Sequence, residues 1–373
     1  ENDAISDTFP DLEDKSWKYG FVSYDYKNRI ESLGSDNPDS FSLPDFCFKK
    51  PDLAFRNQGQ GWEDLLPGKN PREIGAEEIL NNLFDEHGLE HQPVSIRMKT
   101  RFGKEEYIRA VQSIKKRILA GEVYEMNFCQ EFYASGVEIN PAQVFRHLQE
   151  LSPAPFSAFL RKDNIYLISS SPERFLRKEG THLYSQPIKG TRRRGNNAAE
   201  DQRLKEELSA DEKERAENVM IVDLVRNDLS RIAARGSVKV DELFGIYSFE
   251  QVHQMISTIS CTLKPDTSFA EILRATFPMG SMTGAPKIRA MELIEKYERS
   301  RRGLYSGALG VITPQGDFDF SVVIRSILYD SEKKYVSITV GSAITHQSDP
   351  EKEYEECLLK AKGMLLALHA TLE

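Results

Sequence analysis

Cysteine is scarce in this chain of 373 residues, and its four copies lie far apart. Cys47, Cys129, Cys261 and Cys357 form no C-x-x-C pair, and no histidine lies near them at the spacing of metal ligands. Neither a structural zinc site nor a disulfide framework is therefore indicated. Free cysteines of this kind are usually small buried side chains, so we expect all four in the core.

The sequence also lacks a long hydrophobic run and an excess of positive charge. No apolar stretch approaches the roughly 18 residues needed to span a bilayer, and no signal peptide is visible, so we expect a cytoplasmic protein without membrane contact. Lys and Arg number 49 against 58 Asp and Glu, and the net charge of -9 argues against nucleic acid as a partner. Because residue 1 is glutamate, we expect the natural start to lie upstream.

What is present is the composition of an ordinary globular protein, 39% hydrophobic and 10% aromatic. Short aromatic runs between Trp17 and Phe48 predict strands, whereas residues 56–103 have the mixed Gly, Pro and charged composition of a linker. We therefore place a boundary near residue 100. It separates an N-terminal region at 1–100, packed on the core, from a catalytic domain at 101–373.

The larger domain is expected to be α+β, a layered α/β/β/α sandwich of largely antiparallel sheets. Apolar residues at helical spacing predict a helix from Tyr107 to Ile118, which Gly121 ends. Two more helices are predicted at 214–232 and from about Pro350 to Leu372. Strands are expected at 124–128, 165–169, 307–312, 318–328 and 335–340, with turn signals at 314–316 and 331–333 that are typical of hairpins.

Lys189 lies between Ile188 and Gly190 and is followed by three arginines at 192–194. Neighbouring positive charge disfavours a further protonated group, so this setting predicts a lysine whose amine is free to act as a nucleophile. The alternative is a solvated loop lysine beside a basic run, because most lysines are exposed.

Two pairs of glutamates share helix faces, Glu214 with Glu217 and Glu353 with Glu356. Carboxylates from two helices could hold one Mg²⁺ and leave positions open for a ligand, although acidic residues in a first helical turn are also what the helix dipole favours. The helix at 214–232 has no wide polar face. Its central polar residues are therefore expected to form a buried, paired network of Asp223, Arg226, Asn227 and Asp228.

A glycine-containing loop with Gly284, Ala285 and Lys287 leads into a helix that has Pro286 at its first position. Free backbone N–H groups at a helix N-terminus favour a small anion such as a carboxylate. An ordinary turn and cap is the alternative.

Arg325 alternates with apolar residues along the predicted 318–328 strand. This pattern indicates an arginine that binds a carboxylate bidentately or forms a salt bridge to a neighbouring glutamate. Gly341 and Ser342 end the next strand and could bring backbone N–H groups to the same ligand.

Glu173 follows Ser171 and Pro172 directly after a predicted strand. Partial desolvation there would raise its pKa and suit a general acid, unless the residue is an exposed loop glutamate. His253 could orient a substrate hydroxyl, although a lone histidine is more often hydrogen bonded in the core.

The order of these segments along the chain resembles that of the chorismate-utilising enzymes. The similarity covers about residues 100–373 and includes the run from Trp17 to Phe48. It rests on Ser171-Pro172-Glu173-Arg174-Phe175, Pro187-Ile188-Lys189-Gly190-Thr191, Glu217 with Asp223 to Leu229, Gly284-Ala285-Pro286-Lys287, Tyr305-Ser306-Gly307 and Ser348 through Glu356. The segment Pro187-Ile188-Lys189-Gly190-Thr191 resembles that of one branch of the family, the aminodeoxychorismate synthase component I proteins, which make 4-amino-4-deoxychorismate for folate. Anthranilate synthases generally have alanine there.

The resemblance implies a role for each matched residue. Lys189 would add at C2 of chorismate while Glu173 protonates the departing C4 hydroxyl, and ammonia would then displace Lys189 by attack at C4. Thr191 and His253 would contact the hydroxyl and ring region. Mg²⁺ held by Glu217 and Glu356, with help from Glu214 and Glu353, would grip the ring carboxylate. The implied substrate contacts are Gly284, Ala285 and Lys287 near the ring carboxylate, and Tyr305, Arg325, Gly341 and Ser342 at the enolpyruvyl carboxylate.

Glu125 departs from the family pattern. Many relatives have Tyr-Gln-Val-Asn where this chain has Tyr124-Glu125-Met126-Asn127, and isochorismate and salicylate synthases have a water-activating lysine at the position of Glu125. The absence of that lysine argues against hydration of chorismate. The N-terminal region also lacks the Leu-Leu-Glu-Ser segment of feedback-inhibited anthranilate synthases, which weakens a case for regulation by tryptophan.

None of the four cysteines lies in the Gly-x-Cys-x-Gly turn of an amidotransferase, so we expect ammonia to be free or to come from a separate glutamine amidotransferase subunit. Two alternatives remain open. Anthranilate synthase component I would share the fold and the metal and would release anthranilate and pyruvate. A non-catalytic anion-binding partner of a glutaminase would not turn chorismate over.

Overall fold

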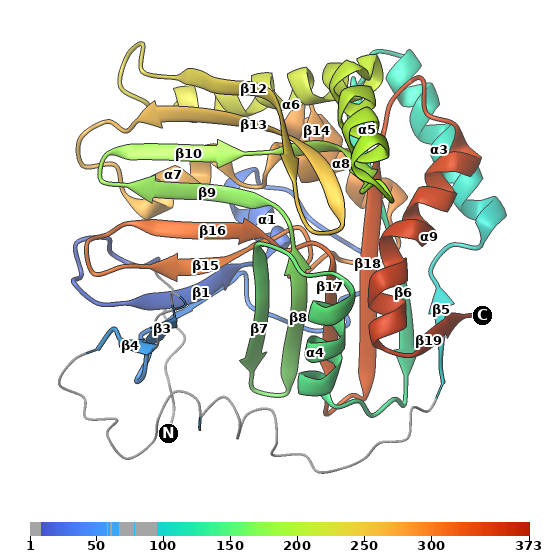
Figure 1. The fold of residues 1–373 in the computed structure, drawn as a ribbon, viewed down its shortest axis with the longest axis horizontal. Coiled ribbons are helices and arrows are strands. Elements are labelled where there is room, and N and C mark those ends of the chain that lie inside the picture. Colours follow the sequence, from blue (N-terminus) through green and yellow to red (C-terminus); the bar gives the residue numbers. More distant parts are fainter. Residues whose placement is uncertain (1–8, 58, 60–61, 67–77, 79–94) are drawn as a thin grey trace.

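Two large β-sheets organise the chain, and in Figure 1 the strands of one run horizontally while those of the other run vertically. The structure is a computed structural model that describes residues 9–57, 59, 62–66, 78 and 95–373. The nine-stranded sheet has the order β11 (Ile188–Arg193), β13 (Val252–Thr262), β10 (His182–Gln186), β9 (Arg174–Glu179), β16 (Phe318–Val322), β15 (Ala308–Ile312), β1 (Lys18–Val22) and β2 (Phe46–Lys49), with β12 (Lys239–Ser248) paired to β13.

The eight-stranded sheet lies beside it. Its order is β19 (Ala370–Leu372), β5 (Ile96–Thr100), β6 (Glu125–Ser135), β18 (Tyr335–Ile344), β17 (Ser326–Asp330), β8 (Ile165–Ser171) and β7 (Phe156–Lys162), with β14 (Gly284–Ala285) paired to β6. Pairing of β19 with β5 is parallel, and the other strand pairs among the described residues are antiparallel. The predicted α+β fold with largely antiparallel sheets is confirmed.

Each sheet has its own helices and its own apolar core. The core of the nine-stranded sheet includes α6 (Glu212–Ser230) and α7 (Phe269–Thr276), with α5 (Ala198–Ala210) nearby, and that of the eight-stranded sheet includes α3 (Lys104–Leu119), α4 (Pro141–Leu151), α8 (Lys287–Tyr297) and α9 (Pro350–Ala367). The four cysteines are free and buried, as predicted. None of the described helices combines the length and apolarity needed to cross a bilayer.

Local sequence explains where the two helices that carry the glutamate pairs begin. Asp211 caps α6 by accepting hydrogen bonds from the backbone N–H groups of Lys213 and Glu214. Asp349 caps α9 in the same way, and Pro350 occupies the first helical position. Each cap satisfies donors that a helix start leaves open, and it thereby fixes which residues face the sheet.

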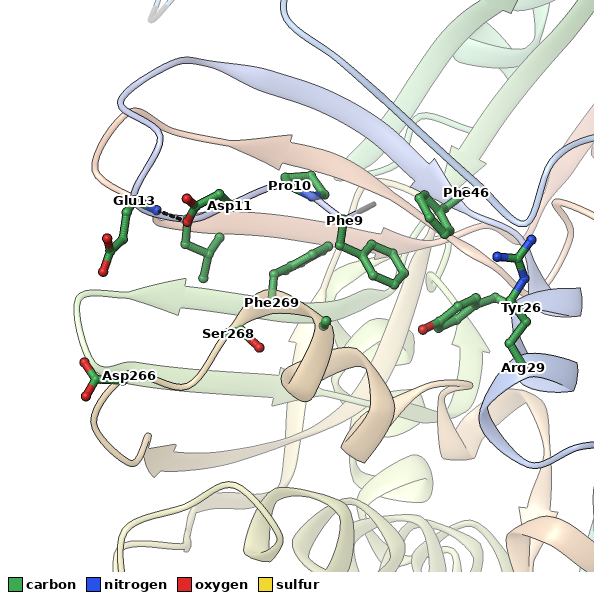
Figure 2. Close-up of a pocket in the computed structure, with 12 residues that line it drawn as sticks. Phe9, Pro10, Asp11, Glu13, Tyr26, Arg29, Phe46, Asp266, Ser268 and Phe269 are labelled. Carbon is green, nitrogen blue, oxygen red and sulfur yellow. Dashed lines mark hydrogen bonds between the residues drawn. The ribbon is translucent and has the colours of Figure 1, made fainter. Parts of the chain in front are cut away.

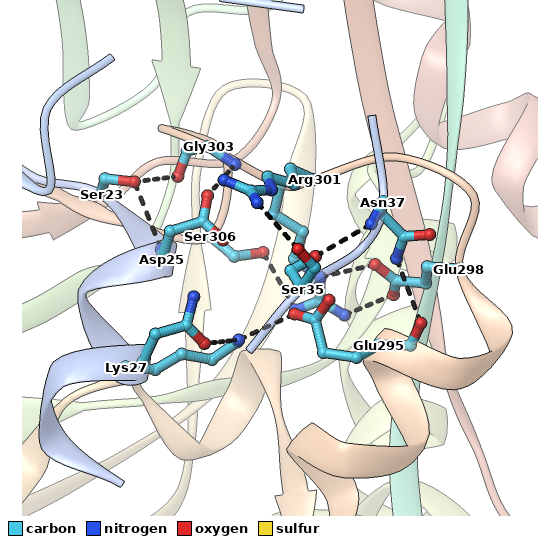
Figure 3. Close-up of polar contacts among 12 residues, drawn as sticks. Ser23, Asp25, Lys27, Ser35, Asn37, Glu295, Glu298, Arg301, Gly303 and Ser306 are labelled. Atoms are coloured by element: carbon cyan, nitrogen blue, oxygen red, sulfur yellow. Dashed lines mark hydrogen bonds and ion pairs between the residues drawn. The ribbon is translucent and has the colours of Figure 1, made fainter. Parts of the chain in front are cut away.

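The N-terminal segment is attached to the end of α8 by a dense set of polar contacts (Figure 3). Ser23 Oγ donates to the carbonyl oxygen of Gly303 at 2.9 Å, and Asp25 Oδ2 accepts from the N–H of Gly303 at 3.1 Å. Nζ of the fully buried Lys27 lies 2.7 Å from Oε1 of Glu295. Because β1 also pairs with β15, residues 18–49 are an integral part of the nine-stranded sheet.

Three sequence predictions need correction. The predicted strand 318–328 is two strands in different sheets, because the chain turns at Val323 and leaves Arg325 with a φ of 52° between them. The C-terminal helix ends at Ala367, and His369 with a φ of 51° turns the chain into β19. The predicted linker 56–103 contains β5, a strand of the core sheet, while its residues 67–77 and 79–94 lie outside the described residues.

The buried polar network predicted for α6 is also wrong in part. Asp223, Arg226 and Asn227 are exposed, and Asp223 forms an ion pair with Arg226 on the helix surface. Asp228 is buried. The helix has a polar face after all, because residues three to four apart share a side of the cylinder.

Candidate active site

Buried charges from both sheets meet at one place. Lys189 lies on β11 and Glu125 begins β6, yet Nζ of Lys189 is 2.7 Å from Oε1 of Glu125. Glu217 of α6 brings Oε2 within 3.9 Å of the same nitrogen. Only 10% of the Lys189 side chain and 3% of the Glu125 side chain are exposed. A lysine buried against two carboxylates marks this junction as a candidate functional site.

The positive field predicted around Lys189 is wrong. The three arginines that follow it turn to other carboxylates: Arg192 to Asp211, Arg193 to Glu200 and Arg194 to Asp201. Burial alone would lower the pKa of Lys189, but Glu125 and Glu217 outweigh it and hold the pKa well above its usual value. In the resting protein Lys189 is therefore an ammonium ion.

Glu173 has the perturbed carboxyl that the sequence predicted. It lies just after β8 with 5% of its surface exposed, and Ser281 Oγ donates to its Oε1 at 2.7 Å. Burial raises the pKa of Glu173 to about 7, against the opposing effects of the Ser281 hydrogen bond and of Lys189. A carboxyl with a pKa of about 7 is protonated in about half of the molecules at neutral pH, and that form is able to donate its proton.

The four glutamates predicted as metal ligands act together on a residue that the sequence analysis missed. Burial would lower the pKa of Lys213, but Glu217, Glu353, Glu214 and Glu356 together raise it. Its Nζ lies 3.7 Å from Oε1 of Glu217. Glu214 and Glu356 also have ion pairs of their own, with Arg192 at 3.7 Å and with Lys360 at 2.6 Å. A metal shared by the four glutamates stays a prediction.

These residues fit a magnesium ion in chemistry rather than as a preformed cage. Oε1 of Glu217 is buried and has no hydrogen-bond partner among the described residues, and burial raises the pKa of Glu217 to about 7. Within the described part of the chain, no three His, Cys, Asp or Glu side chains already converge at metal-binding distance. Mg²⁺ commonly uses one or two protein carboxylates with water and substrate oxygens, which suits this arrangement.

Arg325 forms no ion pair with a carboxylate among the described residues, although Glu356 is near enough to act on its pKa. Its Nη1 donates to the carbonyl oxygen of Lys360 at 3.3 Å, and burial lowers its pKa. Because it lies at the crossing between β16 and β17, it does not alternate along a strand as predicted. A partly buried guanidinium that is not ion paired to a carboxylate is suited to an anionic ligand.

Gly341 and Tyr305 lie around Cys129 of β6. A Cβ at Gly341 would approach Sγ of Cys129 to 2.4 Å, so no other residue fits there. The hydroxyl of the buried Tyr305 is 3.8 Å from the same sulfur. Ser342 follows on β18 and is also buried. Their predicted contacts with a carboxylate remain predictions.

Gly284 and Ala285 form the short strand β14 against Met126 and Glu125, which brings this loop to the edge of the site. Pro286 is the residue before the helix rather than its first residue. Lys287 has an ion pair already, because its Nζ lies 2.5 Å from Oδ2 of the buried Asp228. The structure therefore favours a structural role for Lys287 over the predicted anion contact.

Replacing Lys287 with methionine is expected to lower the free energy of unfolding by about 3–5 kcal/mol, because it leaves the Asp228 carboxylate buried and unpaired. Urea unfolding followed by circular dichroism measures the change. The double variant Asp228→Asn with Lys287→Met should recover part of the loss, and a single-variant loss below about 1 kcal/mol would contradict the role of the pair.

Among the described residues, neither Thr191 nor His253 forms a side-chain hydrogen bond or ion pair with Lys189. Thr191 is exposed on β11. His253 is fully buried on β13, with Nε2 2.9 Å from Oδ1 of Asp201 and Nδ1 2.9 Å from Oγ of Ser248. His253 is therefore a hydrogen-bonded core histidine, which was the alternative to a contact with the substrate hydroxyl.

Gln254 is the next residue on β13. It is buried, and its Oε1 has no hydrogen-bond partner among the described residues. For Glu125, the sequence did give a signal, because glutamate at this position departs from the family pattern.

Pocket size alone does not identify the site. A cavity of about 560 Å³ is lined by Phe9, Tyr26, Phe46 and Phe269. Figure 2 shows these side chains beside α7. None of the predicted site residues lines it. The case for the Lys189 site rests on converging charged groups instead.

Comparisons with a family model and with individual known proteins point to the same family. A family model described as chorismate binding enzyme matches residues 1–366. The chain is 35% identical to anthranilate synthase component 1 of Thermus thermophilus over 94% of this chain and 76% of that protein. It is 44% identical to the chloroplastic aminodeoxychorismate synthase of Arabidopsis thaliana over 92% of this chain and 39% of that protein.

Two further similar proteins are also an aminodeoxychorismate synthase and an anthranilate synthase. Aminodeoxychorismate synthase component 1 of Bacillus subtilis is 34% identical over 98% of this chain and 79% of its own length. The crystal structure of anthranilate synthase component I from Streptococcus pneumoniae has a TM-score of 0.78 at 29% identity and covers 93% of this chain and 80% of that chain. The chain therefore spans about three quarters or more of the component 1 proteins, but less than half of the plant enzyme.

Proposed function

The chain belongs to the chorismate binding enzymes, and we propose that within this family it converts chorismate and ammonia to 4-amino-4-deoxychorismate, as aminodeoxychorismate synthase component I. This reaction would serve 4-aminobenzoate and folate biosynthesis in the cytoplasm. The observation that carries the proposal is Lys189, a nucleophile-type residue buried in the site with its nitrogen 2.7 Å from a carboxylate. Similarity to relatives of both names does not favour either activity.

In the first step the Lys189 amine would form a bond to C2 of the ring as the C4–O bond breaks. Its proton would pass to Glu125, the acceptor at 2.7 Å, because only the free amine has an electron pair to share. Glu173 would give its proton to the departing hydroxyl, which leaves as water.

In the second step the electron pair of ammonia would form the C4–N bond while the C2–N bond to Lys189 breaks and its pair returns to Nζ. The new ammonium would return a proton to Glu173, and Glu125 would return its own to Lys189. The net change is the exchange of hydroxyl for amine with release of one water, so both carboxyls end as they began.

Substrate binding would depend on the cationic and backbone groups around the site. Arg325, with Tyr305 and the backbone of Gly341 and Ser342, would bind the enolpyruvyl carboxylate, while Gly284 and Ala285 would lie near the ring carboxylate. Desolvation outweighs the effects of Tyr305 and Glu356 on the Arg325 pKa, so an anionic partner would stabilise this guanidinium further.

Glu217 and Glu356, helped by Glu214 and Glu353, would hold Mg²⁺. When bound there, the ion would neutralise the ring carboxylate and draw it toward the acidic helices. Chelation with EDTA is expected to abolish turnover, and added Mg²⁺ should restore it. Calorimetric titration of Mg²⁺ should show binding that Glu217→Gln weakens by about tenfold or more. Equal affinities would contradict the assignment.

Ammonia would come from solution or from a separate glutamine amidotransferase. The four thiols of this chain are buried, and burial raises the pKa of Cys261 and Cys357 to about 11. A glutaminase needs a reactive thiolate, whereas these thiols are buried and have a raised pKa, which keeps them protonated.

The proposal is tested by incubating the protein with chorismate, Mg²⁺ and ammonium and identifying the product by mass spectrometry. The expected product is 4-amino-4-deoxychorismate without pyruvate. Fluorescent anthranilate together with pyruvate would establish anthranilate synthase component I instead. No turnover would leave the non-catalytic, anion-binding partner of a glutaminase.

A further inference from the structure

The first residue of β6 carries a carboxylate that the family pattern does not predict. Glu125 is 2% exposed, whereas its neighbour Tyr124 is 72% exposed, so the strand turns the glutamate inward. Its backbone pairs with Ala285 of β14, which fixes the side chain at the edge of the site. The short pairing of β14 with β6 therefore positions Glu125.

The two oxygens of this carboxylate have different surroundings. Oε1 accepts a hydrogen bond from Lys189 Nζ at 2.7 Å. Oε2 is buried and has no hydrogen-bond partner among the described residues. A buried carboxylate oxygen without a donor is costly, and such atoms are rare in native structures unless a ligand or water completes them.

We propose that Oε2 of Glu125 is the ammonia-binding atom of the site. It would accept an N–H of the incoming ammonia and hold the molecule beside Lys189, with its electron pair directed to the ring. This inference rests on the proposed function and adds to it the subsite for the second substrate.

The chemistry of the site favours a nitrogen ligand there over the other reactants. Chorismate carries carboxylates, which the Glu125 side chain would repel. Oε2 of Glu217 lies 3.9 Å from Nζ of Lys189, so a second carboxylate adds negative charge beside Glu125 and favours ammonium over an anion near the site. Ammonia has three N–H donors and one electron pair, so it can donate to Oε2 and still attack.

The two tasks of Glu125 are compatible in one reaction cycle. When Oε1 has taken the Lys189 proton, the carboxyl group still has one oxygen without hydrogen, and that oxygen is Oε2. Ammonia donates to it, forms the C4–N bond and releases the Lys189 nitrogen from C2. Oε1 then returns the proton to Nζ, so no external oxidant, reductant or base is needed.

Steady-state kinetics with varied ammonium test the subsite. In Glu125→Gln the amide nitrogen replaces an acceptor, and the KM for ammonium is expected to rise about tenfold or more while the KM for chorismate stays within about twofold. Glu105→Gln, on the exposed face of α3, is the matched control and should change neither. An ammonium KM within about twofold of the parent value would overturn the proposal.

A binding measurement separates this proposal from the proposed function. Equal concentrations of ammonium chloride and potassium chloride compare two cations of similar size, of which only one has N–H donors. The parent protein should unfold about 1 °C or more higher in ammonium, whereas Glu125→Gln should show no difference. The same difference in both proteins would overturn the subsite even if amination is observed. A difference confined to the parent would support it even if the product is anthranilate or no product forms.

Discussion

Replacing Lys189 with alanine is expected to lower the rate of 4-amino-4-deoxychorismate formation by about 10³-fold or more, because the residue that forms the covalent bond is gone. The KM for chorismate should change much less, since the groups proposed to bind its carboxylates are intact. Initial rates by mass spectrometry, with chorismate and ammonium both saturating, provide the measurement.

Loss of Lys189 also leaves two buried carboxylates, Glu125 and Glu217, without their shared cation, which is expected to cost about 3–5 kcal/mol of stability. Lys189→Arg separates the two effects. Arginine keeps the positive charge but remains protonated and does not attack carbon. A folded Lys189→Arg protein that retains more than about a tenth of the parent rate would exclude Lys189 as the nucleophile.

Replacing Glu173 with glutamine is expected to lower the amination rate by about 10²- to 10⁴-fold, because the leaving hydroxyl then departs without a proton. The substitution is matched to the structure, since the glutamine carbonyl oxygen can still accept the hydrogen bond from Ser281. Rates of the two proteins at pH 6.5 provide the comparison, and a loss below about tenfold would contradict a role as general acid.

The pH dependence of the parent follows from the same carboxyl group. The protonated form is the active acid, and the pKa of Glu173 is about 7, so the rate should fall as pH rises above 7. Lys189 cannot cause this fall, because a higher pH favours its free amine. If the fall persists unchanged in Glu173→Gln, another group is responsible.

The Glu173→Gln substitution, which is expected to lower activity, is expected to raise stability at alkaline pH. The folded-state pKa of Glu173, about 7, exceeds its ordinary value of 4.5. The contribution of Glu173 to the free energy of unfolding is therefore fully present below pH 4.5 and is lost as pH rises through 7. At pH 8 the Glu173→Gln protein should be more stable than the parent by on the order of 3 kcal/mol, and at pH 4 the two should be similar. Such a trade of stability for function is common at active sites.

The sequence predicted the fold class and most elements because these depend on local periodicity. The helix around Tyr107 and the strand through Met126 are examples, with the helix observed at Lys104–Leu119 and the strand at Glu125–Ser135. The strand predicted at 318–328 failed because an apolar run does not show where the chain leaves one sheet for another. That change of sheet at Arg325 is decided by tertiary packing.

The candidate site shows the same division. The raised pKa of Glu173 was predicted from its place after a strand. Helical spacing predicted that the two glutamates of each pair share a face of their helix. The surroundings of Lys189 were predicted wrongly, because the three nearby arginines are neighbours in sequence only. Its true partner, Glu125, is 64 residues away along the chain. Charges brought together by two sheets cannot be inferred from local sequence.

The union of the first strand with a late hairpin has a consequence for synthesis on the ribosome. Ser23 and Gly303 form a hydrogen bond across 280 residues, and β1 pairs with β15 in the same part of the molecule. At about 5–20 residues per second, β1 waits roughly 15–60 s for its partner to be translated. During that interval its apolar edge is open to other nascent chains. The yield of folded protein will therefore depend on chaperone capacity during translation, before any property of the finished site comes into effect.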